Sequence, residues 1–363
     1  MLRGHVFIVN EETLPIHLNY MFVGTSAGGK DSNIGLLSDM LRVKEQDFIF
    51  FYIEGREDKK GRFFGIFRAT DNIVYHLKGL DANSPNLPYI YNKKKKIREP
   101  LKLIYRKRIN PYKVYPAGVF EWIALDKLPT YAKELLWTLI YRKMKGIRGN
   151  TMLLPWEVDR LISLIENENQ DGHLIDSNFT FNQSKYIIGK GNITRTHNIG
   201  NPVSLSLTEI KKNETFFQAY ILQNLNLFNN SFLPQIFGKK IIWIGNEVFA
   251  GSGMQKIDIL TIEKVDETTY LYRIIELKHP KSLMNVSFAP MQLEYYISWA
   301  REDMGGHILG GKKFNIKPIL VALTREFNSI PQNIITEITN LNSISTNPEI
   351  YELDFSLNVN KVL

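Results

Sequence analysis

Arg273-Ile-Ile-Glu-Leu-Lys-His-Pro280 is an apolar stretch that carries a carboxylate and an amine at its centre. Its pattern predicts a β-strand, on which Glu276 and Lys278 point to the same face because they are two residues apart. Asp258 interrupts a second apolar strand, Lys256–Leu260, which precedes it in a predicted hairpin. Two carboxylates and a lysine are therefore expected to converge at one edge of a sheet.

Such a convergence of charges needs a compensating ligand. Without a cation, the carboxylates of Asp258 and Glu276 repel each other and resist burial. Mg²⁺ is commonly bound by one or two carboxylates, together with water and phosphate oxygens. It can activate a water molecule and stabilise a leaving oxygen in phosphodiester hydrolysis. Lys278 could then orient or deprotonate that water, or offset charge in the transition state.

Asp258 followed by Glu276-Leu277-Lys278 resembles the core motif of the PD-(D/E)xK nuclease superfamily. The resemblance covers about residues 204–330. It implies Mg²⁺-dependent DNA hydrolysis, with Asp258 and Glu276 as metal ligands, Lys278 as a catalytic residue and Mn²⁺ as a substitute metal. The proline that precedes the aspartate in the family is Ile257 here, at a position that varies.

Two further motifs are similar to RecB-like members of this superfamily. Glu214 shares a predicted helix face with apolar residues and occupies the place of the family's helical glutamate. Gln292-Leu-Glu-Tyr-Tyr296 matches the Q-x-x-x-Y signature, and four residues along a helix place Gln292 and Tyr296 on one face. The resemblance adds Glu214, Gln292 and Tyr296 to the catalytic residues.

The net charge of +8 is concentrated in one segment. Lys93–Lys113 contains ten basic residues and one acid, a net charge of +9, so the rest of the chain carries −1. Interleaved tyrosines make this segment typical of a polyanion-binding surface, although a solvated loop followed by a basic strand would have the same composition. The residues expected to bind DNA are Lys93, Lys94, Lys95, Lys96, Arg106, Arg108, Arg142 and Arg148.

The N-terminal part contains aromatic strands, Asp47–Ile53 and Arg62–Thr70, joined by a polar turn. With a first strand near His5 and a helix after Ser32, they resemble the EVE and YTH branch of the PUA-like superfamily over about residues 1–168. The resemblance implies a partly closed β-barrel that recognises a modified base flipped into an aromatic pocket. Core packing is the alternative role for most of these aromatics. The candidate pocket residues are Trp122, Phe120, Ser26 and Gly28.

An Asn-rich stretch separates the two parts. Residues 166–202 contain seven asparagines among Gly, Ser and Thr, which predicts a linker or a long irregular loop. The expected organisation is a PUA-like reader at 1–168, a linker at 169–203 and a PD-(D/E)xK nuclease at 204–363. The expected fold class is α/β plus α+β, with a mixed C-terminal sheet flanked by helices and an N-terminal partly closed barrel with helices.

The composition of the chain excludes several classes of protein. The 363 residues include no cysteine, which excludes disulfide scaffolds, cysteine nucleophiles and thiolate metal sites. No apolar run is long enough to span a bilayer, so a cytoplasmic protein without a membrane partner is expected. The preferred hypothesis is a Mg²⁺-dependent endonuclease for restriction or defence that acts on double-stranded DNA, either at a modified base or at a specific site. It would form a homodimer if it cuts both strands. The alternatives are a repair nuclease for damaged, mismatched or branched DNA, and a nucleic-acid-binding protein with an inactive nuclease fold.

Overall fold

The computed structural model describes thirteen ranges of the chain. These ranges are 3–26, 34–55, 61–76, 89–92, 97–100, 103–126, 149–153, 155–176, 178–191, 199–225, 233–251, 255–304 and 313–363. Two compact units are present. The N-terminal unit comprises most of residues 2–203, and the C-terminal unit comprises residues 204–363.

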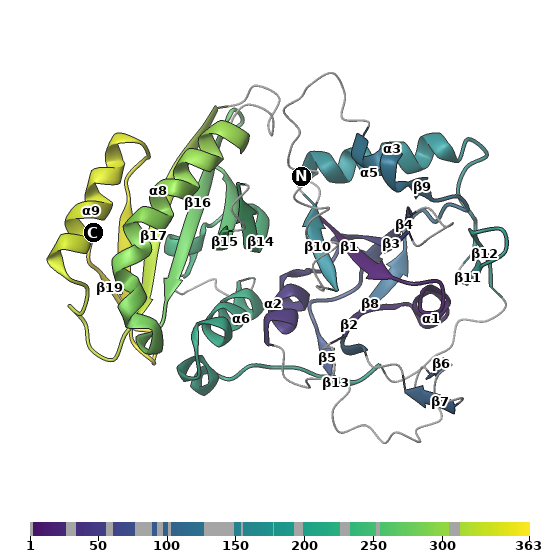
Figure 1. Ribbon diagram of the computed structural model, residues 1–363, viewed down its shortest axis with the longest axis horizontal. Helices are drawn as coiled ribbons and strands as arrows, with labels where there is room; N and C mark the ends of the chain where they lie inside the picture. The colour runs from purple at the N-terminus through teal and green to yellow at the C-terminus, as the bar shows by residue number, and fades with distance from the viewer. Residues whose placement is uncertain are drawn as a thin grey trace. The chain divides into compact units, whose positions relative to one another are not determined.

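A curled, half-barrel sheet forms the N-terminal unit (Figure 1). Its main path is β10-β1-β3-β4-β8-β5-β13, with β2 paired to β8 and β9 paired to β4. The strands are β1 (Gly4–Val9), β2 (Phe22–Ser26), β3 (Phe48–Ile53), β4 (Arg62–Ala69), β5 (Tyr75–His76), β8 (Leu103–Pro111), β9 (Val119–Phe120), β10 (Asn150–Leu153) and β13 (Asn201–Pro202). The two aromatic strands β3 and β4 pair antiparallel, which confirms the predicted hairpin.

Aromatic and aliphatic side chains from β3, β4 and α5 fill the core of this unit. Helix α5 begins at a proline, which suits the first helical turn because its missing N–H has no acceptor there. The sequence also predicts two helices at the end of this part, at about 131–145 and 156–167; α5 confirms the second, and the first lies outside the described residues. The helices are α1 (Leu14–Tyr20), α2 (Ile34–Arg42), α3 (Glu121–Asp126) and α5 (Pro155–Glu168), and a separate hairpin is β6 (Tyr89–Asn92) with β7 (Ile97–Pro100).

The Asn-rich stretch contains regular structure where an irregular linker is expected. Strands β11 (Phe179–Asn182) and β12 (Ile187–Lys190) form an antiparallel hairpin within it. Phe179 and Phe181 are buried, and their rings meet those of aromatic residues on β4 edge-on. The alternation of Phe, Thr, Phe and Asn places two large apolar groups on one face, so a segment that is polar on average still contributes to the core.

The C-terminal unit contains a six-stranded mixed sheet flanked by helices (Figure 1). Its order is β14-β15-β16-β17-β18-β19. Strand β15 pairs antiparallel with β14 and β16, β17 pairs parallel with β16 and β18, and β19 pairs antiparallel with β18. The strands are β14 (Ile241–Ala250), β15 (Gln255–Lys264), β16 (Thr269–Lys278), β17 (Lys313–Leu323), β18 (Glu349–Leu353) and β19 (Val359–Lys361).

Helices connect and cover this sheet. Helix α8 follows β16 and packs against β16 and β17. The pattern Ser206-x-x-Glu209 predicts a capping box that opens the first helix of this unit. The capping box is present, since the Glu209 carboxylate accepts from the Ser206 N–H at 3.1 Å, but it opens only a short 3₁₀ turn. The helices are η1 (Leu207–Lys211), α6 (Glu214–Asn224), α7 (Leu233–Phe237), η2 (Pro280–Phe288), α8 (Ala289–Trp299), η3 (Ala300–Met304), α9 (Gln332–Asn340) and η4 (Leu341–Ser343). Over the described part of the chain, none of the helices has the length and apolarity to cross a membrane.

Candidate active site

The predicted convergence of charges lies where strands β15 and β16 part. Their backbone pairing ends at Ile259 and Ile275, one residue before Asp258 and Glu276. Beyond this point the Asp258 carboxylate replaces the partner strand's carbonyl, since its Oδ2 accepts from the Leu277 N–H at 2.8 Å. The backbone donor remains satisfied while the two strands separate.

Glu276 and Lys278 form a buried ion pair on β16. The Lys278 Nζ lies 2.5 Å from Glu276 Oε1, and both side chains are almost completely buried because β16 is flanked by β15 and β17. The other carboxylate oxygen, Glu276 Oε2, is buried and has no hydrogen-bond partner among the described residues. A buried carboxylate oxygen without a donor is costly, so this atom is suited to an additional ligand.

The pKa values of this group reflect burial and mutual repulsion. Burial raises the pKa of Asp258 well above its usual range, and the nearby charges of Glu276 and Glu214 raise it further. Burial also raises the pKa of Glu276 to about 6, although the Lys278 ammonium opposes this shift. For Lys278, burial acts to lower the pKa, but the Glu276 carboxylate outweighs it and the pKa is raised. Lys278 therefore carries a positive charge at neutral pH.

Glu214 is the first residue of α6. The helix starts there because the Asn213 side chain caps it, accepting from the Phe216 N–H at 3.1 Å. Glu214 is half-buried, and its negative charge raises the pKa values of both Asp258 and Glu276. The structure therefore brings this predicted residue within electrostatic range of the two strand carboxylates.

Gln292 and Tyr296 lie one turn apart on α8. The buried Tyr296 hydroxyl donates to the Lys256 carbonyl at 2.8 Å. Its pKa is raised by burial and then by the charges of Glu276 and Asp258, so Tyr296 lies close to both acids. Gln292 is half-buried, and within the described part of the chain its Oε1 has no hydrogen-bond partner. All six predicted catalytic residues thus belong to one region of the C-terminal unit.

Glu247 is a carboxylate that sequence reasoning missed. Register places it opposite Asp258, because Asn246 pairs with Ile259 and Val248 pairs with Ile257. Its φ of 50° is in the left-handed region, which is unusual for glutamate within a strand. Glu247 forms an ion pair with Lys256 at 3.0 Å, and its charge raises the pKa of Glu276. The sequence signal for Glu247 was an acidic residue in the mostly apolar stretch 241–250.

The donor set is suited to a metal with few protein ligands. Within the described ranges, no three or more Asp, Glu or His side chains are grouped so that they could hold a metal ion. Asp258 and Glu276 are therefore two candidate ligands, a number that Mg²⁺ accepts when water and phosphate supply the rest. The partnerless Glu276 Oε2 and the raised pKa values of both acids fit a divalent cation, which would relieve the repulsion.

Phe120 and Trp122, the candidate pocket walls, stack on each other in the N-terminal unit. Their ring centroids are 4.3 Å apart with an interplanar angle of 13°, so no base fits between the two rings. The Arg62 guanidinium lies 4.0 Å from the Phe120 centroid and 5.1 Å from that of Tyr186. Trp122, Phe120, Arg62 and Tyr186 thus form a row of planar groups in contact. Trp122 is 39% exposed and is the member with the most accessible ring.

Ser26, another candidate pocket residue, lies on a separate part of the same sheet. It pairs with Leu103 at the start of β8, whereas Phe120 pairs with Arg62 at the start of β4. Strands β4 and β8 meet only at their other ends, at 67–69 and 109–111. Register thus separates Ser26 from the ring pair, and Gly28 lies outside the described residues.

The basic segment does not form a continuous exposed stripe. Arg106 is completely buried, which contradicts its expected place on a DNA-binding surface. Its Nε donates to the Leu103 carbonyl at 2.8 Å and its guanidinium lies over the Phe22 ring. Arg106 pairs with Gly24 of β2 and with Tyr75 of β5, and its side chain packs on this part of the sheet, whereas a DNA-binding residue needs an exposed side chain. Arg108 is exposed, as expected. Lys93, Lys94, Lys95, Lys96, Arg142 and Arg148 lie outside the described residues.

Comparisons with known proteins add little. No family model matches the chain, and no curated protein matches it. Among solved structures, a hypothetical protein from Leishmania major is similar to it, with 10% sequence identity. The similarity covers 46% of this chain and 97% of the Leishmania chain, with a TM-score of 0.32. A likeness this weak supports no conclusion about fold or function.

Proposed function

We propose that this protein is a Mg²⁺-dependent endonuclease that hydrolyses phosphodiester bonds in DNA. The proposal rests on one observation: Asp258, Glu276 and Lys278 meet where β15 and β16 separate, with a buried carboxylate oxygen that has no partner among the described residues. Carboxylates that repel each other in a desolvated place are typical of a cation site. The resemblance to the PD-(D/E)xK superfamily supports the same function.

Each residue has a proposed role in this reaction. Asp258 and Glu276 would hold the metal, which supplies Lewis-acid chemistry when bound. Lys278 stabilises negative charge on the phosphate in the transition state, because its raised pKa keeps it protonated and unsuited to proton abstraction at neutral pH. Tyr296, fixed by the Lys256 carbonyl, and Gln292 line the approach to these groups.

The N-terminal unit is proposed to choose the DNA site. Trp122 offers a ring face backed by Phe120 and Arg62, and a nucleobase can stack on such a face. Arg108, exposed on β8, would contact phosphate. The proposed role is restriction of foreign DNA at a modified base. The PUA-like resemblance of residues 1–168 carries the reader assignment.

Plasmid cleavage tests the proposed function. The full chain should nick or linearise plasmid with Mg²⁺ and should be inactive with EDTA. Asp258→Ala and Glu276→Ala should each reduce cleavage by orders of magnitude while leaving DNA binding largely intact. Near wild-type cleavage by either variant would refute the site. Modified, unmodified and mismatched duplexes, compared side by side, distinguish restriction from repair.

A further inference from the structure

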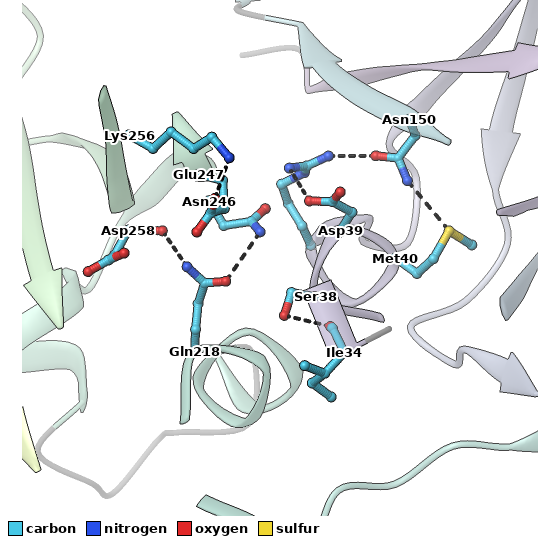
Figure 2. Close-up of polar contacts among 11 residues, drawn as sticks. Ile34, Ser38, Asp39, Met40, Asn150, Gln218, Asn246, Glu247, Lys256 and Asp258 are labelled. Atoms are coloured by element: carbon cyan, nitrogen blue, oxygen red, sulfur yellow. Dashed lines mark hydrogen bonds and ion pairs between the residues drawn. The ribbon is translucent and has the colours of Figure 1, made fainter. Parts of the chain in front are cut away.

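Gln218 connects helix α6 to the strand that carries Asp258. It is buried, lies one helical turn after Glu214, and its Nε2 donates to the Asp258 backbone carbonyl at 2.9 Å (Figure 2). Because a carbonyl can only accept, the nitrogen of the Gln218 amide must face Asp258. The amide oxygen therefore faces away from Asp258.

Asn246 completes this connection from the neighbouring strand. Its Nδ2 lies 3.5 Å from Gln218 Oε1, a long hydrogen bond between two buried amides. Asn246 is on β14, and the residue after it, Glu247, has the left-handed φ described above. A chain of three polar groups thus links β14, α6 and β15 beside the candidate metal site.

The position of the Asp258 carbonyl gives Gln218 its importance. Asp258 lies just beyond the last backbone pair of β15 with β16, so β16 no longer pairs with it, while β14 still pairs with Ile257 and Ile259 on either side. Its side chain is held by the Leu277 N–H and its backbone by Gln218. Both contacts determine where the carboxylate lies. Residues behind the ligands commonly influence metal affinity in this way.

We propose that Gln218 is a positioning residue that fixes Asp258 for metal binding and sets the distance between Asp258 and Glu214. This inference rests on the proposed function. Gln218 touches the backbone of a ligand and not the reacting atoms. Through the one-turn spacing on α6, it also ties Glu214 to the same strand, so that the three carboxylates keep one arrangement.

The test replaces Gln218 with a side chain of similar length that cannot form hydrogen bonds. In the full chain, Gln218→Met should weaken Mg²⁺ binding, measured by isothermal titration calorimetry, about 10- to 100-fold. The Mg²⁺ concentration for half-maximal plasmid cleavage should increase by the same factor. Asn246→Leu should have a smaller effect in the same direction, because its bond is longer. If Gln218→Met fails to fold, Asn246→Leu tests the same chain of hydrogen bonds to Asp258.

Gln223 provides a matched control on the same helix. Its side chain bonds the N–H and carbonyl of Leu205, away from the strand carboxylates. Gln223→Met should lower the unfolding temperature and leave Mg²⁺ affinity unchanged. If Gln218→Met, or Asn246→Leu in its place, matches the control in Mg²⁺ affinity, the positioning role is refuted. The wild-type chain and Asp258→Ala separate this outcome from failure of the proposed function: if the proposed function fails, either the wild-type chain does not cleave plasmid with Mg²⁺ or Asp258→Ala binds Mg²⁺ and cleaves as well as wild type.

Discussion

Two buried lysines, one in each unit, have opposite pKa shifts. Lys278 in the C-terminal unit has a raised pKa, and Lys44 in the N-terminal unit has a pKa lowered to about 7. Both side chains are at most 5% exposed. Burial acts in the same direction on each, disfavouring the ammonium. The difference therefore comes from the charges around them.

The neighbouring charges explain the contrast. Lys278 is 2.5 Å from Glu276 and is also within range of Asp258 and Glu214, three negative groups. At Lys44, burial is the largest cause of the lowered pKa, and the charge of Lys107 lowers the pKa further. The attraction of Asp47 raises it, but too little to compensate. The Asp47 carboxylate already accepts from Arg3, His5 and the Lys44 N–H. A buried lysine thus serves as a fixed cation only where carboxylates exceed cations around it.

Removing the Lys278 charge should have the largest effect. Lys278→Met is expected to reduce single-turnover cleavage of plasmid about 10²- to 10³-fold, because a fixed positive charge near the phosphate is lost. Glu276 would also lose the ammonium that lowers its pKa, so its pKa would rise further above about 6. The residual activity should therefore require a higher pH than wild type.

Lys278→Arg is the matched variant, since it keeps the charge and changes the shape of the donor. It should retain more activity than Lys278→Met and keep the pH profile close to wild type. Cleavage by Lys278→Met within threefold of wild type at every pH would show that the ion pair is structural only.

The second prediction concerns stability at the other lysine. The folded pKa of Lys44 is about 7, below its unfolded value of 10.5, so the unfolded state binds the proton more readily between these values. The cost in folding free energy of burying the protonated Lys44 is therefore complete below pH 7, and it disappears as the pH rises towards 10.5. Lys44→Met should therefore raise the unfolding free energy by on the order of 1–3 kcal/mol at pH 7 and flatten its rise with pH.

Urea unfolding at pH 6.5, 8.0 and 9.5 measures this slope. Lys185, exposed in the turn between β11 and β12, provides the control, and Lys185→Met should leave the slope unchanged. Lys107, whose pKa burial lowers to about 8, should maintain part of the slope in the Lys44 variant. An unaltered slope in Lys44→Met would mean that the pKa of Lys44 is not lowered in the folded state.

The two lysines also differ in how far sequence could predict them. Glu276 and Lys278 were identifiable because alternation on a strand is local, so two residues of separation place both on one face. Lys44 follows a helix in a polar context, and only the sheet that covers it makes it unusual. The burial of Arg106 was not foreseen for the same reason, since sequence does not reveal its tertiary contacts with the Leu103 carbonyl and the Phe22 ring.

Within the C-terminal unit, sequence predicted some features of the candidate site and not others. The two strands that carry Asp258 and Glu276 were predicted from alternation, and the six catalytic candidates were identified from spacing together with the family resemblance. Gln218 and Glu247 did not, because one depends on where strand pairing ends and the other on a left-handed backbone angle. The hairpin at 179–190 was missed because its average polarity concealed the alternation of Phe179 and Phe181.

The smallest predicted effect extends the comparison to cations that share one strand. Arg108 is exposed on β8 and Arg106, two residues away, is buried, with its pKa lowered to about 10 by burial. If β8 contacts DNA, Arg108→Ala should weaken binding a few-fold and reduce the log–log salt slope by about 0.9, the contribution of one phosphate contact. Arg106→Met should instead lower the unfolding temperature and leave the slope unchanged.

Fluorescence anisotropy between 50 and 200 mM salt, in the Asp258→Ala background to prevent cleavage, measures the affinity and the salt slope of both variants. The reverse pattern, with the slope altered only by Arg106, would mean that β8 opens on DNA and that burial does not decide which cations bind phosphate.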